Sequence, residues 1–423
     1  MSTAVASAEP KVEHLQRRVL RVLTATQVLG ACGVAVGLAV STLIAAALSG
    51  SDAVGGLAQT SAVLGAALLA LPAARLAARR GRRPALALGY GAGALGAALA
   101  AVAVVVASWP ALLVSLVLFG GATSANLAAR YAATDLAHPH RRARSLAVVV
   151  WASTIGAVAG PNLADPAGRL AAFVGLPAGA GPFLLAAVAF AAAAFAVLVL
   201  LRPDPLAVVR VAHPAVRPAA HCAGGALPAP GVTAVWRSLR SSARLALAGV
   251  TLCHTAMVGL MSMTPVHMNH SGASLRVVGV VISVHVAAMY VASPLFGWMA
   301  DRLGRVPVLA IGASLVVAAS GVAGMAPSHD APQLAAGLAL LGFGWSAGLV
   351  AGSALLTESV AVPDRPAAQG LSDLCMNIGG AVGGAVAGVV VTAWSYAALG
   401  LIVGFTALPL LMVCLLATMR RAR

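Results

Sequence analysis

Charged residues, and acidic ones above all, are scarce in this chain of 423 residues. Only 9% of the residues are charged, and 11 Asp and Glu stand against 27 Lys and Arg. Aromatic residues make up 4%, whereas hydrophobic residues reach 60% and the mean hydropathy is +0.95. Many apolar runs are long enough to cross a bilayer core of about 30 Å, which takes about 20 helical residues. The composition therefore predicts an all-α polytopic membrane protein.

Other absences narrow the class further. A cleavable signal peptide is not evident, because the polar start contains Glu9 and Glu13 and leads into a full-length apolar segment. No nucleophile–base constellation, phosphate-binding loop or cofactor fingerprint occurs, so neither an enzyme nor a resident cofactor is expected. The five cysteines have no pairable spacing, which argues against a disulfide framework. They are Cys32, Cys222, Cys253, Cys375 and Cys414.

Twelve apolar segments are predicted to span the membrane. They cover residues 20–48, 54–76, 84–107, 110–132, 145–165, 178–201, 244–267, 275–298, 306–326, 332–356, 370–394 and 396–418. Of the 27 basic residues, only Arg169 and Arg276 then fall in the loops opposite the termini. This asymmetry predicts a multi-pass protein of the cytoplasmic (inner) cell membrane with both termini in the cytoplasm. The net charge of +16 therefore indicates how the chain is oriented in the membrane. We expect membrane lipid as a partner and no nucleic acid.

Short sequence patterns recur in the two halves of the chain, which indicates an internal duplication. Phe119-Gly120 in the fourth span recurs as Phe343-Gly344 in the tenth, at an offset of 224 positions. The sequence thus predicts two six-helix bundles, residues 1–201 and 244–423. A largely irregular cytoplasmic loop, residues 202–243, joins them and is expected to hold a short amphipathic helix around Trp236 to Arg244.

Glycine pairs recur at the same offset: Gly156 and Gly160 in the fifth span, Gly380 and Gly384 in the eleventh. Small residues four apart let helix backbones approach closely in lipid. The matched pairs are expected to form rocking interfaces between the halves.

A charged loop follows the eighth span. It reads Gly297-Trp-Met-Ala-Asp301-Arg302-Leu-Gly304-Arg305 and resembles the signature G-x-x-x-D-R-x-G-R of the major facilitator superfamily. The resemblance implies twelve helices in two pseudo-symmetric bundles and a loop that acts in gating. The first-half copy keeps Gly81 and Arg82, but Ala78 stands where the pattern has Asp. A weaker contact, or one that uses a different acid, is expected there.

Soft metal ligands gather in the second half. Ten of the 11 methionines lie at or after Met257, and Met257 and Met261 are four residues apart, as are His285 and Met289. Residues four apart share a helical face. Met257 and His285 each lie ten residues from the outer end of their span, about 15 Å deep. Because the two helices are sequential and antiparallel, the four side chains are expected to converge near the midplane. Thioether and imidazole together select Cu(I) over hard cations.

This pair of motifs, MxxxM and HxxxM, resembles the CcoA-type copper importers of the major facilitator superfamily. The resemblance implies that Met257, Met261, His285 and Met289 carry copper through the membrane. Copper is then cargo, delivered for cuproenzyme assembly, and a cytoplasmic copper chaperone would be a partner. Further residues near the four are candidate metal contacts: Cys253, His254, Met263, His267, Met268 and His270.

Three interpretations compete. The first is copper import by alternating access. The second is a transporter of the same fold for a small organic cargo, such as a drug exchanged for protons or a vitamin. The third is a metal-sensing or structural membrane protein that does not transport, which the duplicated halves disfavour. Asp373 and Glu358, with His254, are the most reachable groups for proton coupling, although both acids are predicted to lie near cytoplasmic span ends.

Overall fold

The computed structural model describes residues 2–212, 232–269, 271–272 and 274–422, and the regular structure within these ranges is entirely helical. The helices are α1 (Ser2–Ser49), α2 (Asp52–Arg80), α3 (Arg82–Val105), α4 (Trp109–Ala132), η1 (Pro139–Arg141), α5 (Arg142–Phe173), α6 (Ala180–Leu200), α7 (Pro205–Ala212), α8 (Val232–Ser238), α9 (Ser241–Asn269), α10 (Leu275–Val291), α11 (Ser293–Leu303), α12 (Arg305–Gly324), α13 (Ala331–Ser359), α14 (Arg365–Ala393) and α15 (Tyr396–Ala422).

Twelve of the described segments are long and apolar enough to cross a membrane, which confirms the predicted number of spans. α5 is longer than the segment 145–165 because Pro161 and Pro166 are accommodated inside the helix. The eighth span is divided into α10 and α11, and Ser293-Pro294 begins the second piece. Proline has no N–H to donate and favours the first turn of a helix, so the break falls where the sequence requires it.

The predicted helix around Trp236 to Arg244 is not one element. α8 ends at Ser238 and α9 begins at Ser241, so the chain breaks inside that range. Part of the predicted central loop is instead α7, which directly follows α6. The loop is therefore less irregular at its start than its composition suggests.

The described residues form two compact units. Unit 1 comprises residues 2–138, 152–212, 232–238 and 360–374, and unit 2 comprises residues 139–151, 239–269, 271–272, 274–359 and 375–422. The first turns of α14 thus belong to unit 1, and the first turns of α5 to unit 2. The start of α5 and the start of α14 each cluster with the other half of the chain. The predicted division at residues 201 and 244 therefore stays a prediction.

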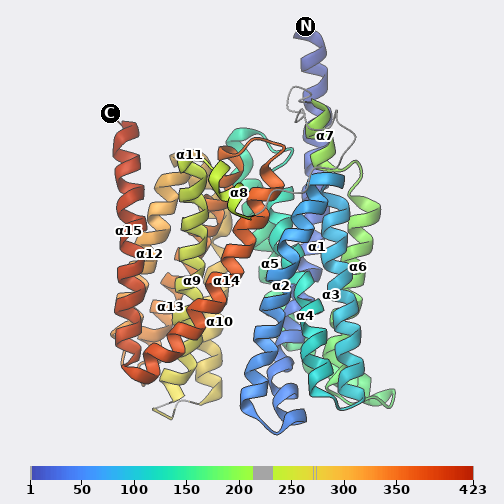
Figure 1. Ribbon diagram of the computed structural model, residues 1–423, viewed down its shortest axis with the longest axis vertical. Helices are drawn as coiled ribbons and strands as arrows, with labels where there is room; N and C mark the ends of the chain where they lie inside the picture. Colours follow the sequence, from blue (N-terminus) through green and yellow to red (C-terminus); the bar gives the residue numbers. More distant parts are fainter. Residues whose placement is uncertain (1, 213–231, 270, 273, 423) are drawn as a thin grey trace. The chain divides into compact units, whose positions relative to one another are not determined.

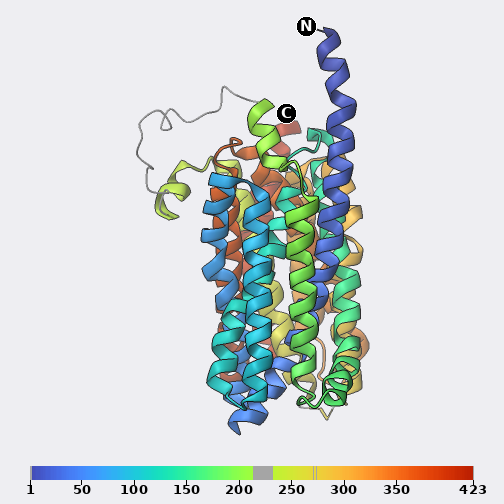
Figure 2. The same ribbon diagram turned by 90° about the vertical axis from the view of Figure 1, so that its right-hand side faces the viewer.

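Unit 1 is built on close approaches between helix backbones. A Cβ atom added to Gly120 of α4 would meet backbone atoms of Ala62, Gly65 and Ala66 in α2. The side chains of Phe119 and Phe190 meet edge to face, with 5.2 Å between ring centroids. α1 runs the length of this bundle, and its N-terminal end extends beyond the other helices of unit 1 (Figures 1 and 2). Small residues therefore set the helix spacing, and large apolar ones fill the core.

In unit 2, α13 is the central helix. It packs against α9, α10 and α12, and most of its apolar residues are buried. α9 and α10 contact each other only slightly, although they follow each other in the sequence. Side chains of α9 and α10 that belong to one site must therefore meet beside α13.

Candidate functional site

His285 of α10 is fully buried against α13. Its Nδ1 lies 2.7 Å from the carbonyl oxygen of Leu338, and a carbonyl can only accept a hydrogen bond. Nδ1 therefore carries the proton, and Nε2 of the neutral ring is left with its lone pair. Nε2 is buried and has no hydrogen-bond partner. A histidine that donates one ring N–H to a carbonyl and keeps the other nitrogen open has the arrangement of metal-binding histidines.

Met289 lies one turn beyond His285 and is also buried, with 7% of its surface exposed. α10 approaches α13 closely here. A Cβ atom added to Gly342 would lie 2.7 Å from the carbonyl oxygen of His285 and 2.9 Å from the amide nitrogen of Met289. The glycine therefore permits the contact that buries both side chains.

Met257 and Cys253 of α9 are buried, with 4% and 2% exposed, whereas Met261 is half-buried. A Cβ atom at Gly348 of α13 would lie 2.6 Å from the Cys253 sulfur, so this face of α9 packs against α13. α9 and α10 contact each other only slightly, and both pack mainly on α13. The expectation that Met257, Met261, His285 and Met289 converge on one site stays a prediction.

Three rings connect α9, α13 and α10 beside these residues. The indole N–H of Trp345 donates to Nδ1 of His254 at 3.0 Å. The same indole meets Tyr290 nearly perpendicularly, with 5.6 Å between ring centroids. Because the indole can only donate, Nδ1 of His254 is an acceptor and its Nε2 carries the proton of the neutral ring. The lone pair of His254 is thus engaged, in contrast to that of His285.

The candidate residues at the C-terminal end of α9 are held by neighbours in unit 2. Nε2 of His267 lies 3.0 Å from the carbonyl oxygen of Ala326, and its ring stacks on Tyr396 at 4.3 Å. Met268 is fully buried and Met263 half-buried. His270 lies outside the described residues. The described part of the chain contains no group of three or more His, Cys, Asp or Glu arranged to hold a metal ion.

The charged loop of the second half is a closed network within unit 2. The two carboxylate oxygens of Asp301 accept the backbone N–H groups of Ala143 and Arg144 at 3.1 and 3.0 Å, at the start of α5. Arg305 bridges Asp301 at 3.1 Å and Glu358 at 2.7 Å. A carboxylate at a helix N-terminus accepts hydrogen bonds from the free amide groups and interacts favourably with the positive end of the helix dipole.

The other residues of this motif lie at the same junction, where α11 meets α12 and the start of α5. A Cβ atom on Gly297 would meet the Ala147 side chain at 2.6 Å, so α11 and α5 need a glycine there. Gly304 has φ of +100°, which lets the chain turn between α11 and α12. Arg302 is exposed and lies over the Trp298 ring.

The first-half copy uses other acids. Arg82 donates to both oxygens of Asp135, at 2.7 and 3.1 Å, and Asp204 accepts the backbone N–H of Arg83 at 2.7 Å. Gly81 turns the chain with φ of +97°. Ala78 offers no carboxylate, and acids from the end of α4 and the start of α7 bind the arginines instead.

The glycine pairs lie inside the halves. Gly156 and Gly160 pack against α1, where added Cβ atoms would meet Cys32 and Ala35, and Gly380 packs against His254 of α9. Gly384 is looser, 3.6 Å from Val258. The contacts printed for these glycines are with the first helix of their own half, and the expectation of rocking interfaces between the halves stays a prediction.

Sequence reasoning missed a buried ion pair in unit 1. Arg130 of α4 donates to Asp373 of α14 at 2.7 Å, and Arg130 and Asp373 are 1% and 4% exposed. Asp373 is eight residues inside α14, since that helix begins at Arg365 rather than near residue 370. The early start follows from Pro366, which suits a first turn. An ionisable residue inside a span was the available signal, but its partner lies 243 positions away.

A second polar network in unit 1 is neutral. Gln27 of α1 donates to Ser153 of α5 at 2.8 Å, and Tyr90 of α3 donates to Asn126 of α4 at 2.9 Å. The Tyr90 hydroxyl also lies 3.4 Å from the carbonyl oxygen of Thr26. These contacts join four helices, and no local pattern in the sequence predicts them.

Comparison with known proteins decides the family. The sequence matches the Major Facilitator Superfamily over residues 23–275 and 246–423. The chain belongs to the major facilitator superfamily. The members of this family are secondary transporters, so the protein is a multi-pass membrane transporter.

Relatives and solved structures agree with this assignment. The chain is 38% identical to the uncharacterised MFS-type transporter YdeG of Bacillus subtilis, covering 96% of this chain and 93% of the relative. It is 28% identical to the riboflavin transporter RfnT of Brucella anthropi over 85% of each chain.

Two solved structures share the fold. The human organic anion transporter MFSD10 has a TM-score of 0.73 at 18% identity, covering 94% of this chain and 99% of that one. A bacterial homologue of the iron transporter ferroportin has a TM-score of 0.73 at 12% identity, covering 94% and 98%. These likenesses identify the fold and leave the cargo open.

Proposed function

We propose that this transporter imports copper across the cytoplasmic membrane, by alternating access and with both termini in the cytoplasm. The observation that carries the proposal is the state of His285. Its Nδ1–H is bound to the Leu338 carbonyl, and its buried Nε2 has no partner. An orphaned imidazole nitrogen costs free energy in an apolar interior unless a ligand uses it.

Sulfur completes a soft donor set. Met289 follows His285 by one turn on α10, and Met257 of α9 is also buried, on a helix that packs against α13 as α10 does. Thioethers are neutral, so a Cu(I) ion can be bound and released without protonation of the sulfur. Copper is the cargo in this account, and direction into the cytoplasm follows the resemblance to CcoA-type importers.

The test is uptake of radioactive copper under reducing conditions by cells that express the chain. His285→Ala and Met257→Ala are expected to lower uptake by about tenfold or more, the scale of effect on losing groups of a metal site. Met325→Ala is the matched control, because this side chain is 80% exposed. Uptake by His285→Ala and Met257→Ala equal to that of the control variant would contradict the proposal.

A small organic molecule is the second candidate cargo. The cluster of His254, Trp345 and Tyr290 presents aromatic faces and polar edges of the kind that bind planar rings. The relative RfnT transports riboflavin, a planar heteroaromatic compound. Uptake of labelled riboflavin that is lost in Trp345→Ala and unaffected by His285→Ala would favour this alternative.

A further inference from the structure

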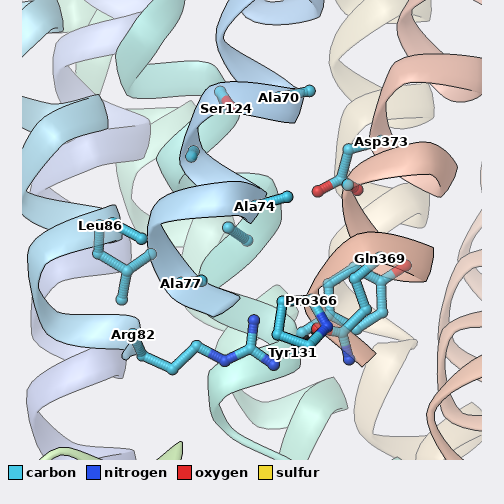
Figure 3. Close-up of a pocket in the computed structure, with 14 residues that line it drawn as sticks. Ala70, Ala74, Ala77, Arg82, Leu86, Ser124, Tyr131, Pro366, Gln369 and Asp373 are labelled. Atoms are coloured by element: carbon cyan, nitrogen blue, oxygen red, sulfur yellow. Dashed lines mark hydrogen bonds between the residues drawn. The ribbon is translucent and has the colours of Figure 1, made fainter. Parts of the chain in front are cut away.

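A small cavity in unit 1 lies between α2, α3, α4 and the first turns of α14 (Figure 3). Its volume of about 20 Å³ leaves room for about one water molecule. Two of the polar residues on its lining, Arg82 and Gln369, already bind each other at 2.6 Å. This cavity is therefore too small for any ligand larger than water.

A much larger cavity, of about 420 Å³, lies in unit 2. Sites for small molecules have volumes of about 300–1,000 Å³. The lining comes from the start of α9, the turn between α11 and α12, and the last turns of α13. Its polar side chains belong to Arg240, Ser242, Arg305, Glu358 and Ser359. The orientation proposed above places this end of unit 2 at the cytoplasmic face.

Glu358 is the only acid among the lining residues, and Arg305 neutralises it. Nε and Nη2 of Arg305 donate to Oε1 of Glu358 at 3.1 and 2.7 Å. Nη1 of Arg305 donates to the carbonyl oxygen of Ala300 at 2.7 Å, and Nη2 also donates to that of Pro139 at 2.9 Å. The guanidinium of Arg305 is therefore engaged on all sides and fixes one wall of the cavity.

Arg240 lines the same cavity but is not engaged. Its guanidinium is exposed and makes no hydrogen bond or ion pair with any residue that the structure describes. The half-buried hydroxyl groups of Ser242 and Ser359 also have no hydrogen-bond partner in the described part of the chain. The cavity thus keeps one uncompensated positive charge and three side chains that can donate hydrogen bonds.

The sequence around Arg240 strengthens the positive charge. Arg237, Arg240 and Arg244 follow one another between Trp236 and Leu245 without an acid among them. Arginines beside a span are ordinary orientation signals, and such a role explains their number. It does not explain a cavity of this size beside one of them, with hydroxyl groups from two helices on its lining.

We propose that this cavity binds a phosphate group, carried either by a soluble phosphate compound or by the headgroup of an anionic lipid. The planar guanidinium of Arg240 can donate two parallel hydrogen bonds to a phosphate. The hydroxyl groups of Ser242 on α9 and Ser359 on α13 can donate to its other oxygens. A tetrahedral phosphate has oxygens in several directions, so it suits donors from two helices better than a planar carboxylate does. The site is independent of the cargo assignment.

The binding test uses the purified full chain in a maltoside detergent, which contains no phosphate. Saturating inorganic phosphate should raise the unfolding temperature by about 2 °C or more relative to chloride of equal ionic strength, because a ligand of the folded state stabilises it. Arg240→Gln should lose this rise, and Arg240→Lys should keep part of it. Arg276→Gln, which removes an exposed arginine at the start of α10, is the matched control and should respond as the wild type does. A rise of wild-type size in Arg240→Gln would overturn the proposal.

Glu358→Gln provides a test of opposite sign. The substitution removes the only acid on the lining and frees Arg305, so inorganic phosphate should bind several times more tightly than to the wild type. A purely structural role of this ion pair predicts no gain in affinity. Affinity that stays equal or falls in Glu358→Gln contradicts the phosphate site.

Phosphatidylglycerol added to the same micelles separates the two sources of the phosphate group. A rise in unfolding temperature with inorganic phosphate alone assigns a soluble ligand, and a rise with the lipid alone that Arg240→Gln abolishes assigns a headgroup. A rise with both shows that the phosphate group itself is recognised. No rise with either overturns the proposal, whatever the copper uptake of the same protein.

Discussion

His285 and His254 illustrate how a single hydrogen bond sorts chemically identical side chains. His285 donates from Nδ1 to Leu338 and leaves Nε2 open. His254 accepts at Nδ1 from Trp345, so its lone pair is engaged. The sequence distinguishes the two histidines only by spacing, because His285 belongs to the HxxxM motif and His254 does not. The partners on α13, 53 and 91 positions away, show which ring nitrogen of each is engaged.

A pair of matched substitutions tests this distinction. His254→Gln should keep copper uptake within about twofold of wild type, whereas His285→Gln should lower uptake by about tenfold or more, because only His285 presents a free ligand nitrogen. Radioactive uptake normalised to the amount of protein in the membrane is the measurement. Equal losses in the two variants would mean that His254 is a ligand as well.

At the scale of elements, glycine positions and proline positions decide where helices meet and where they end. Gly342 brings α10 against α13, and Gly120 brings α4 against α2. Pro294 and Pro366 lie at the start of α11 and α14. The prolines are visible in the sequence and would have predicted both boundaries. The glycine partners are not visible, because 45 glycines offer too many equivalent choices.

Two alanine substitutions separate packing from helix propensity. Gly120→Ala should lower the free energy of unfolding by about 1–3 kcal/mol, because its Cβ atom would overlap the α2 backbone. Gly91→Ala should be neutral or stabilising by up to about 1 kcal/mol, since a Cβ atom there meets nothing within 4 Å and alanine favours helix. Thermal unfolding in detergent measures both. A Gly120→Ala protein as stable as Gly91→Ala would show that α2 and α4 can move apart at no cost.

At the scale of the whole molecule, the class, the twelve spans and the family followed from apolar length, charge asymmetry and one loop motif. These signals are local and repeat along the chain. The site was harder, since it depends on which helices pack together. Sequential order does not show that α13 lies against both α9 and α10. The Arg130 and Asp373 pair joins positions 243 apart, which no local periodicity encodes.

The central claim is that copper binds to His285 and the neighbouring thioethers, and X-ray absorption on the purified full chain loaded with Cu(I) tests it most directly. The account predicts a sulfur shell with one imidazole around the metal. His285→Ala should remove the imidazole contribution and Met257→Ala should reduce the sulfur contribution, whereas Met325→Ala should change neither. A copper spectrum identical in His285→Ala and wild type, or a wild-type chain that retains no copper, would contradict the account.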